Sequence, residues 1–262
     1  MKSIWLIANG TFGEAIRRRT LLVFLLVVAV IIIAGAASLS LQPGHDAINT
    51  LGLGVILLTG VVISVIIGIN LLPTEIERRT VYTILSKPVH RYQFLCGKFL
   101  GGLMTVLSSV GLMAFVFLTL VVIQERGFDK AVGDAAKGLV LIVFAITLVS
   151  AIAMFFSVFV SPFVNFFLTL AIYLLGCASS VTKALADPTS DPTQHKSIIV
   201  VDIFKVVHAV IPNFANYNVQ NKILTPEVTI GPNFLSYNIL YAVAYSMLLL
   251  TIASLVFSRR EV

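Results

Sequence analysis

The charged side chains of this sequence that could bind another molecule gather in one polar stretch, residues 73–98, between two strongly apolar runs. Thr74 and Glu77 have the spacing of a capping box, in which a hydroxyl and a carboxylate bind the free N–H groups at the start of a helix. This helix should end near Lys87, because a residue that precedes a proline avoids the helical conformation. The stretch therefore predicts a short charged helix, held at a membrane surface and shaped to receive force from another protein.

No residue pattern in the sequence indicates catalysis. His208 could act as a general base, but a single histidine on a polar helix face is more often simply solvated, and no Ser/His/Asp cluster or metal-ligand spacing accompanies it. Gly97 and Lys98 lack the upstream glycine and the following hydroxyl residue of the phosphate-binding loop G-x-x-x-x-G-K-[ST]. We therefore expect no catalytic residue, no metal site and no cofactor in this chain.

The composition places the chain in a membrane. Of its 262 residues, 58% are hydrophobic and 11% are charged, and the mean hydropathy is +1.00. A soluble core could not hide that much apolar surface. The net charge of +6 could indicate a nucleic-acid partner, but the positions of the basic residues favour membrane topology instead. We expect an integral membrane protein that binds no nucleic acid.

Six apolar stretches are long enough to cross a bilayer as helices, which takes roughly 20 residues. They are residues 20–40, 51–72, 99–123, 138–160, 163–182 and 238–257. Their interiors contain no Asp, Glu, Lys, Arg or His, whereas ion and proton pathways use such groups at a cost of at least ~2.5–3.5 kcal/mol each. The sequence therefore predicts an all-α integral membrane protein of six transmembrane helices, whose energy comes from another subunit.

Residues 1–19 predict a helix that lies in the membrane interface before the transmembrane domain of residues 20–262. The residues that share its apolar side are Ile4, Trp5, Ala8, Phe12, Ala15 and Ile16. A signal peptide is the alternative, with basic Arg17–Arg19 before an apolar run and a small-residue cleavage site at 34–36. The apolar run continues to Leu41, at full spanning length, which favours the interfacial helix.

The distribution of basic residues sets the orientation of the chain. With the N-terminus inside, eleven Lys and Arg residues and four acidic residues fall on the inner side, a net charge of +7. Seven basic and eight acidic residues fall on the outer side, a net charge of −1. Because basic loops stay in the cytoplasm, we expect a multi-pass protein of the cytoplasmic (inner) membrane with both termini cytoplasmic. Residues 73–98 would then be inside and the largest loop, 183–237, outside.

The outer loop should contain a helix of its own. It opens with a Pro-rich segment, residues 187–192, which is typical of a linker. Apolar residues then recur at helical spacing, at Ile199, Ile203, Val206, Val207 and Val210. Asp202, Lys205 and His208 are their polar counterpart, and Pro212 ends the pattern. We expect an interfacial helix on the outer side of the membrane.

The polar stretch resembles the first cytoplasmic loop of type-two ATP-binding-cassette (ABC) exporter permeases, in the branch often labelled as the permease component for copper-enzyme maturation. The residues that carry this resemblance are Glu75, Glu77, Thr80, Leu85, Pro88, Arg91, Gly97 and Lys98. Many relatives have Gly where this chain has Arg79. In the resembling proteins the helix docks on an ATPase. The coupling residues that the resemblance implies are Thr74, Glu75, Glu77, Arg78, Arg79, Thr80, Leu85, Pro88 and Arg91.

Small and polar residues inside the spans allow two interpretations. Gly97, Gly101, Thr105 and Ser109 lie four apart on one face, which permits close helix approach. Two other spans, 51–72 and 163–182, resemble the helices that line the central path in these exporters. Their polar residues are Thr59, Ser64, Asn70, Asn165, Thr169, Tyr173 and Ser180. Each of these residues either serves helix packing or lines a translocation path.

The resemblance implies a membrane-spanning permease subunit of an ABC exporter, which moves its substrate with ATP hydrolysed elsewhere. A separate ABC ATPase subunit would bind ATP and Mg²⁺, and this chain would not itself be an enzyme. Further partners would be a second copy or a related permease, membrane lipid, and a periplasmic or accessory subunit. The alternative is a membrane scaffold or assembly factor that transports nothing. The substrate stays open between a lipid, a hydrophobic drug or peptide, and a factor for metalloenzyme assembly.

The predicted topology is tested by labelling single cysteines in intact cells with a membrane-impermeant thiol reagent. The Ser190→Cys variant should react, because residues 185–236 are expected outside. The Ser86→Cys variant should not react, because it lies in the inner polar stretch. Labelling at residue 86 without labelling at residue 190 would reverse the topology.

Overall fold

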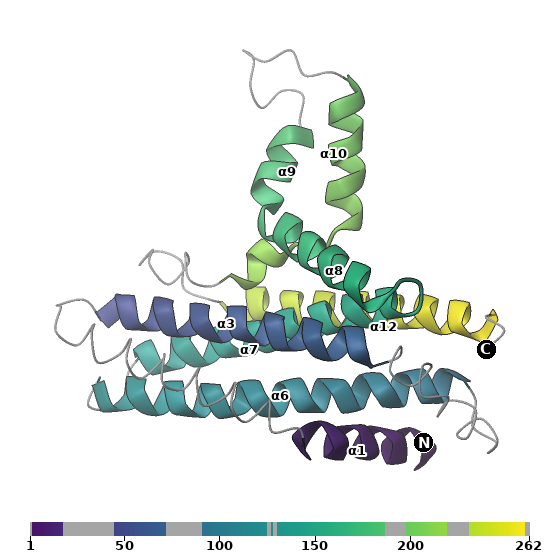
Figure 1. Ribbon diagram of the computed structural model, residues 1–262. Helices are drawn as coiled ribbons and strands as arrows, with labels where there is room; N and C mark the ends of the chain where they lie inside the picture. Colours follow the sequence, from purple (N-terminus) through teal and green to yellow (C-terminus); the bar gives the residue numbers. More distant parts are fainter. Residues whose placement is uncertain are drawn as a thin grey trace.

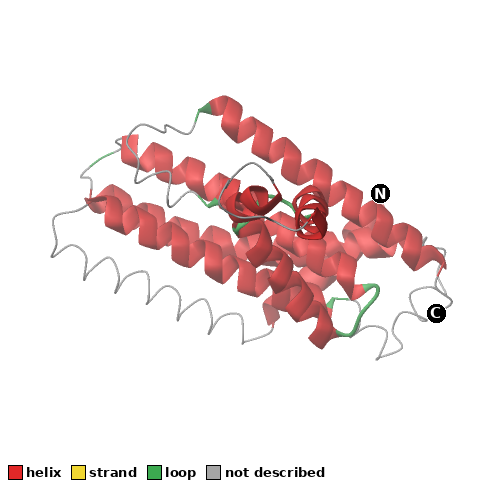
Figure 2. Ribbon diagram, turned by 90° about the horizontal axis from the view of Figure 1, so that it is seen from above, coloured by secondary structure: helices red, strands yellow, loops and turns green. Residues whose placement is uncertain are grey.

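The computed structural model of the chain is helical throughout its described part (Figure 1). The structure describes residues 2–17, 45–71, 91–124, 127, 130–186, 198–218 and 231–259. Within these ranges the chain forms helices and turns and no strand (Figure 2). The predicted all-α class is confirmed. The first predicted span, 20–40, and residues 73–90 of the polar stretch lie outside the described residues.

Among the described residues, four helices are long and apolar enough to cross a membrane. They are α3 (His45–Asn70), α6 (Arg91–Gln124), α7 (Lys130–Ser157) and α12 (Pro232–Arg259). The shortest apolar segment, in α3, has 21 residues, about 31 Å of helix, which covers a hydrocarbon core of about 30 Å. The four helices form one bundle (Figure 1), and each contains one of the predicted spans or most of it.

The predicted span at 163–182 is interrupted. Its first part, α8 (Pro162–Cys177), has 16 residues, or about 24 Å, which is less than the ~30 Å of a hydrocarbon core. The helix ends at Ala178, whose N–H donates to the carbonyl oxygen of Leu174 at 3.1 Å. A second helix, α9 (Ser179–Ala186), then leaves in another direction (Figure 1). The six-span count therefore stays a prediction.

Helices α9 and α10 (Ile198–Val210) pack against each other and project sideways from the bundle. Figure 2, turned by 90°, shows this pair end on, which confirms that it stands across the bundle. A 3₁₀ helix, η1 (Phe214–Tyr217), leads back to the bundle and lies against α7 and α8. The position of α10 agrees with the helix that the sequence predicted before Pro212.

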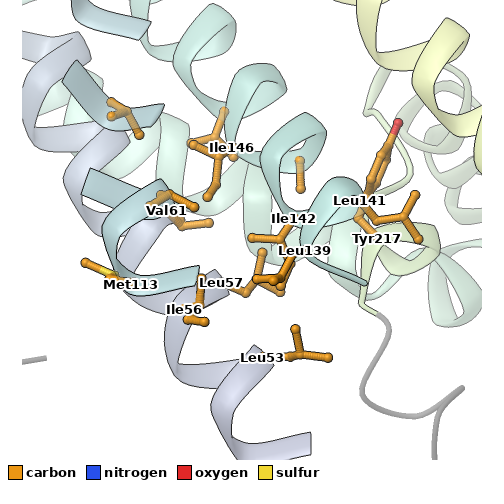
Figure 3. Close-up of a cluster of buried hydrophobic side chains, with 14 of the residues drawn as sticks. Leu53, Ile56, Leu57, Val61, Met113, Leu139, Leu141, Ile142, Ile146 and Tyr217 are labelled. Carbon is orange, nitrogen blue, oxygen red and sulfur yellow. The ribbon is translucent and has the colours of Figure 1, made fainter. Parts of the chain in front are cut away.

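The apolar core lies between α3, α6 and α7. Helix α7 is central to it, since Ile142 and Ile146 are 0–1% exposed. Figure 3 shows Ile56 of α3, Met113 of α6 and Ile146 of α7 converging in this cluster. Because lipid tails are as apolar as these side chains, contact between well-fitted surfaces holds such helices together, rather than escape from water.

The N-terminal helix α1 (Lys2–Arg17) packs along the first turns of α6. A methyl group at Gly97 would lie 3.0 Å from the carbonyl oxygen of Ile4, and one at Gly101 would lie 2.6 Å from that of Ala8. The predicted small-residue face of α6 therefore receives α1. Helix α1 runs beside α6 in the same direction (Figure 1), because the glycines let the two backbones approach lengthwise. The interfacial position of residues 1–19 stays a prediction.

The close approach of α1 and α6 predicts that Gly101→Ala destabilises the protein by about 1–3 kcal/mol, the usual cost of overpacking. The added methyl group would meet the backbone of Ala8, which cannot move aside as a flexible side chain can. Gly111→Ala is the matched control, because it lies on the same helix with nothing within 4 Å of the added methyl group. Thermal unfolding in mild detergent would measure both variants. Equal melting temperatures for the two would contradict this packing.

Candidate functional site

Of the predicted coupling residues, the described structure includes Arg91, the first residue of α6. Its Nη1 atom donates to the carbonyl oxygens of Phe257 at 3.4 Å and Ser258 at 3.5 Å. A cation that binds the last carbonyl groups of a helix also interacts favourably with the helix dipole. The other coupling residues lie outside the described part; they are Thr74, Glu75, Glu77, Arg78, Arg79, Thr80, Leu85 and Pro88.

Aromatic contacts reinforce the bond between the start of α6 and the end of α12. The rings of Phe94 and Phe257 stack with their centroids 6.4 Å apart, and both side chains are buried. The ammonium of Lys98, itself buried, lies 6.0 Å from the centroid of the Phe94 ring, within the range of a cation–π interaction. We call Arg91, Phe94 and Phe257 the clamp. It holds the polar stretch where it enters the bundle.

The clamp was not predicted. Its two halves are 166 positions apart in the sequence, and neither phenylalanine differs from the many others in the spans. Of these three residues, the sequence analysis identified only Arg91 as a candidate, because it lies in the polar stretch that resembles the first cytoplasmic loop of ABC exporter permeases.

Ser64, one of the predicted path residues, forms hydrogen bonds between α3 and α7. Its Oγ donates to the carbonyl oxygen of Ile146 at 3.3 Å and can at the same time accept from the Oγ of Ser150, 2.6 Å away. Both serines line a cavity of about 10 Å³ between α3, α6 and α7, which has room for about one water molecule. This cavity is too small for a transported substrate.

Asn165 and Thr169 join α8 to α7. Both side chains are 0% exposed. The Nδ2 of Asn165 donates to the carbonyl oxygen of Ala153 at 2.9 Å, and the hydroxyl of Thr169 donates to the Oδ1 of Asn165 at 2.9 Å. Such bonds between transmembrane helices are worth roughly 0.6 kcal/mol on average and ~1.7 kcal/mol at most. The two residues form a buried polar chain within one subunit.

The other predicted path residues have varied environments. Thr59 is buried, whereas Asn70 is exposed and donates to the backbone of its own helix at 2.8 Å. Tyr173 is half-buried with its ring against Phe214, the centroids 5.2 Å apart, and Ser180 is exposed on α9. The structure therefore does not bring the seven residues together on one surface. The contacts of the buried members are those of helix packing, and a role in lining a path stays a prediction.

A polar junction forms where the α9–α10 pair returns to the bundle. The phenol of Tyr217 donates to the carbonyl oxygen of Asn238 at 2.7 Å, and Ser179 donates to the Oδ1 of Asn213 at 2.7 Å. Burial raises the pKa of Tyr217, so this phenol remains protonated and able to donate. The hydroxyl of Tyr245 donates to the carbonyl oxygen of Val210. Sequence reasoning missed these bonds, because they join residues that are adjacent only in the fold.

Metal-ligating side chains do not gather in the described ranges, which contain no group of three or more His, Cys, Asp or Glu residues able to hold an ion.

Comparison with known protein families gives a match over nearly the whole chain. A family model described as "ABC-2 family transporter protein" matches residues 5–262. No curated protein matches the chain. Because the family match covers nearly the whole chain, it includes the first predicted span and the polar stretch as well as the described bundle.

The buried chain at Asn165 predicts that Asn165→Ala lowers stability by about 1–2 kcal/mol, because it leaves the hydroxyl of Thr169 and a carbonyl group of α7 without their partner. Asn70→Ala is the control, since its amide is exposed and bonds only within its own helix; it should change stability by less than about 0.5 kcal/mol. Melting curves measure both effects. Unchanged stability of Asn165→Ala with lost transport would favour the path interpretation over packing.

Proposed function

The chain belongs to the ABC-2 family of transporter proteins, and from this membership we propose that it is the permease subunit of an ABC exporter. The single observation that carries the proposal is the family match over residues 5–262 on a chain with at least four helices able to span a membrane. Permeases of this family normally work with an ABC ATPase, often as a dimer. In our proposal that ATPase binds ATP and Mg²⁺, and this chain forms the membrane path.

The proposed assembly contains two ATPase subunits and two permeases, the second being another copy or a related chain. It lies in the cytoplasmic membrane with both permease termini inside, as the charge distribution favours. A periplasmic or accessory subunit would complete it where the substrate requires one. Substrate leaves the cytoplasm or the membrane when the ATPases close and the spans tilt, a rigid-body switch of the kind used in alternating access.

The clamp supports the proposed route of force. The predicted coupling helix, residues 74–85, ends six residues before Arg91, and Arg91 binds the last turn of α12. A push on the coupling helix would therefore reach α6 through the chain and α12 through the clamp. Two spanning helices would move together, as a rigid-body switch requires.

The test of this proposal is the amount of ATPase that co-purifies with the permease in mild detergent. Glu77→Ala and Arg79→Ala should each reduce it, because truncating one member of a buried interfacial charge pair costs ~2–5 kcal/mol of affinity. Their melting curves should change little, since exposed ion pairs contribute only about 0–1 kcal/mol to folding. Asp134→Ala is the control, because its exposed pair with Lys137 at 2.8 Å lies at the start of α7.

Three results would contradict parts of the proposal. Full ATPase binding and transport by both charge variants would show that residues 74–85 do not couple to the ATPase. Loss of binding only through misfolding would make this helix structural. Wild-type permease that retains no ATPase would instead favour the membrane scaffold or assembly factor.

A further inference from the structure

Asn238 of α12 has a side-chain oxygen that no described group binds. The side chain is 0% exposed, and its Nδ2 donates to the carbonyl oxygen of Phe234 at 2.8 Å. This bond fixes the orientation of the amide, because turning the amide over would set two oxygen atoms against each other. The Oδ1 atom is therefore the one that stays buried without a hydrogen-bond partner among the described residues.

A buried side-chain oxygen of this kind normally has a donor. The large majority of buried polar atoms in proteins are bonded to another protein group or to an ordered water. An oxygen without a donor has given up its bonds to water and received nothing in return, which makes its burial unfavourable. The Oδ1 atom of Asn238 therefore points to a bound molecule that can donate a hydrogen bond.

Phenol groups lie around this oxygen. The hydroxyl of Tyr217, which is 1% exposed, donates to the backbone carbonyl oxygen of Asn238 at 2.7 Å, and the phenol oxygen can still accept. Tyr237 and Tyr241 of α12 are close enough to Tyr217 to interact with it electrostatically. The phenol of Tyr241 accepts from the N–H of Asn213, so its own proton can be donated to a further group.

This polar cluster extends from the buried oxygen to the surface of the described structure. Tyr237 is 65% exposed, whereas Tyr217 and Asn238 are buried. In Figure 3 the oxygen of Tyr217 points away from the apolar cluster in which its ring lies. A small polar molecule can therefore approach Asn238 beside Tyr237 without crossing the apolar core.

We propose that Asn238 and Tyr217 form a binding site for one buried water molecule, which donates to the Oδ1 of Asn238. The phenol oxygen of Tyr217 is its second partner, since Tyr217 is already bonded to the same asparagine. Buried waters have about two to four polar partners. A divalent cation is bound mainly through carboxylates, and this cluster of tyrosines and asparagines has none. The water joins η1 to α12, and the proposal is independent of the transport function.

The experiment is X-ray hydroxyl-radical footprinting of the full-length protein in lipid nanodiscs. Radicals formed from an ordered water oxidise the side chains that touch it, even where bulk solvent does not reach them. Tyrosine and phenylalanine react with these radicals at similar intrinsic rates. Tyr217 should therefore be oxidised several-fold faster than Phe117 of the apolar core, although each is 1% exposed.

Asn238→Leu should lower the oxidation of Tyr217 to the rate of Phe117. This variant removes the unpaired oxygen and keeps a side chain of similar size, while the backbone carbonyl group that Tyr217 binds stays in place. Asn70→Leu is the matched control, because its amide is exposed and bonds only within its own helix. It should leave the rate at Tyr217 unchanged. If Asn238→Leu does not fold, the comparison of Tyr217 with Phe117 in the wild-type protein still decides.

Three results would overturn the inference. Equal rates for Tyr217 and Phe117 in the wild-type protein would show that no water is bound beside Tyr217. Fast oxidation of Tyr217 that Asn238→Leu leaves unchanged would assign the water to another group. A melting temperature that is higher in sodium than in choline at equal ionic strength, and only in the wild-type protein, would place a cation on the Oδ1 of Asn238. No ATPase is needed, so these results are separate from those that test the proposed function.

Discussion

The bundle depends on contacts that remain favourable when the surrounding solvent is lipid. Apolar side chains gain little by leaving lipid for one another, so backbones must approach closely or exchange a few hydrogen bonds. Both solutions occur here. Gly97 and Gly101 admit the backbone of α1, and Ser64 with Ser150 joins α3 to α7. Asn165 does the same for α8 and α7. Ser64 and Asn165, two of the polar residues that invite a transport interpretation, are therefore bonded to a neighbouring helix of the same subunit.

Sequence reasoning predicted the features that follow from local composition. The spans within α3, α6, α7 and α12 are long apolar runs, and such runs form helices because lipid offers no partner to an exposed peptide group. The amphipathic pattern of α10 was equally local. The family match over residues 5–262 confirms the resemblance that the polar stretch suggested, although most of the predicted coupling residues lie outside the described structure.

What the sequence could not predict depends on contacts between distant residues. The break at Ala178 follows an apolar run without proline, and it occurs where Pro212 packs against Gly176. The clamp joins Arg91 to Phe257, and Tyr245 binds the carbonyl oxygen of Val210 at the end of α10. Each of these residues is of a type that is common in the segment around it, so no pattern of composition or spacing identified the distant residue that it contacts.

Helix α12 is bonded both to the start of α6 and to the end of α10. Its last turn accepts hydrogen bonds from Arg91, where the polar stretch enters the bundle, and its middle donates one to the end of α10. These two points are twelve residues apart, about 18 Å along a helix, and the segment between them is continuous α-helix. A continuous helix transmits displacement along its length without a hinge, so a shift at the clamp would reach the junction of the α9–α10 pair. Under the proposed function, one helix would therefore carry motion from the clamp, next to the predicted coupling helix, to the α9–α10 pair.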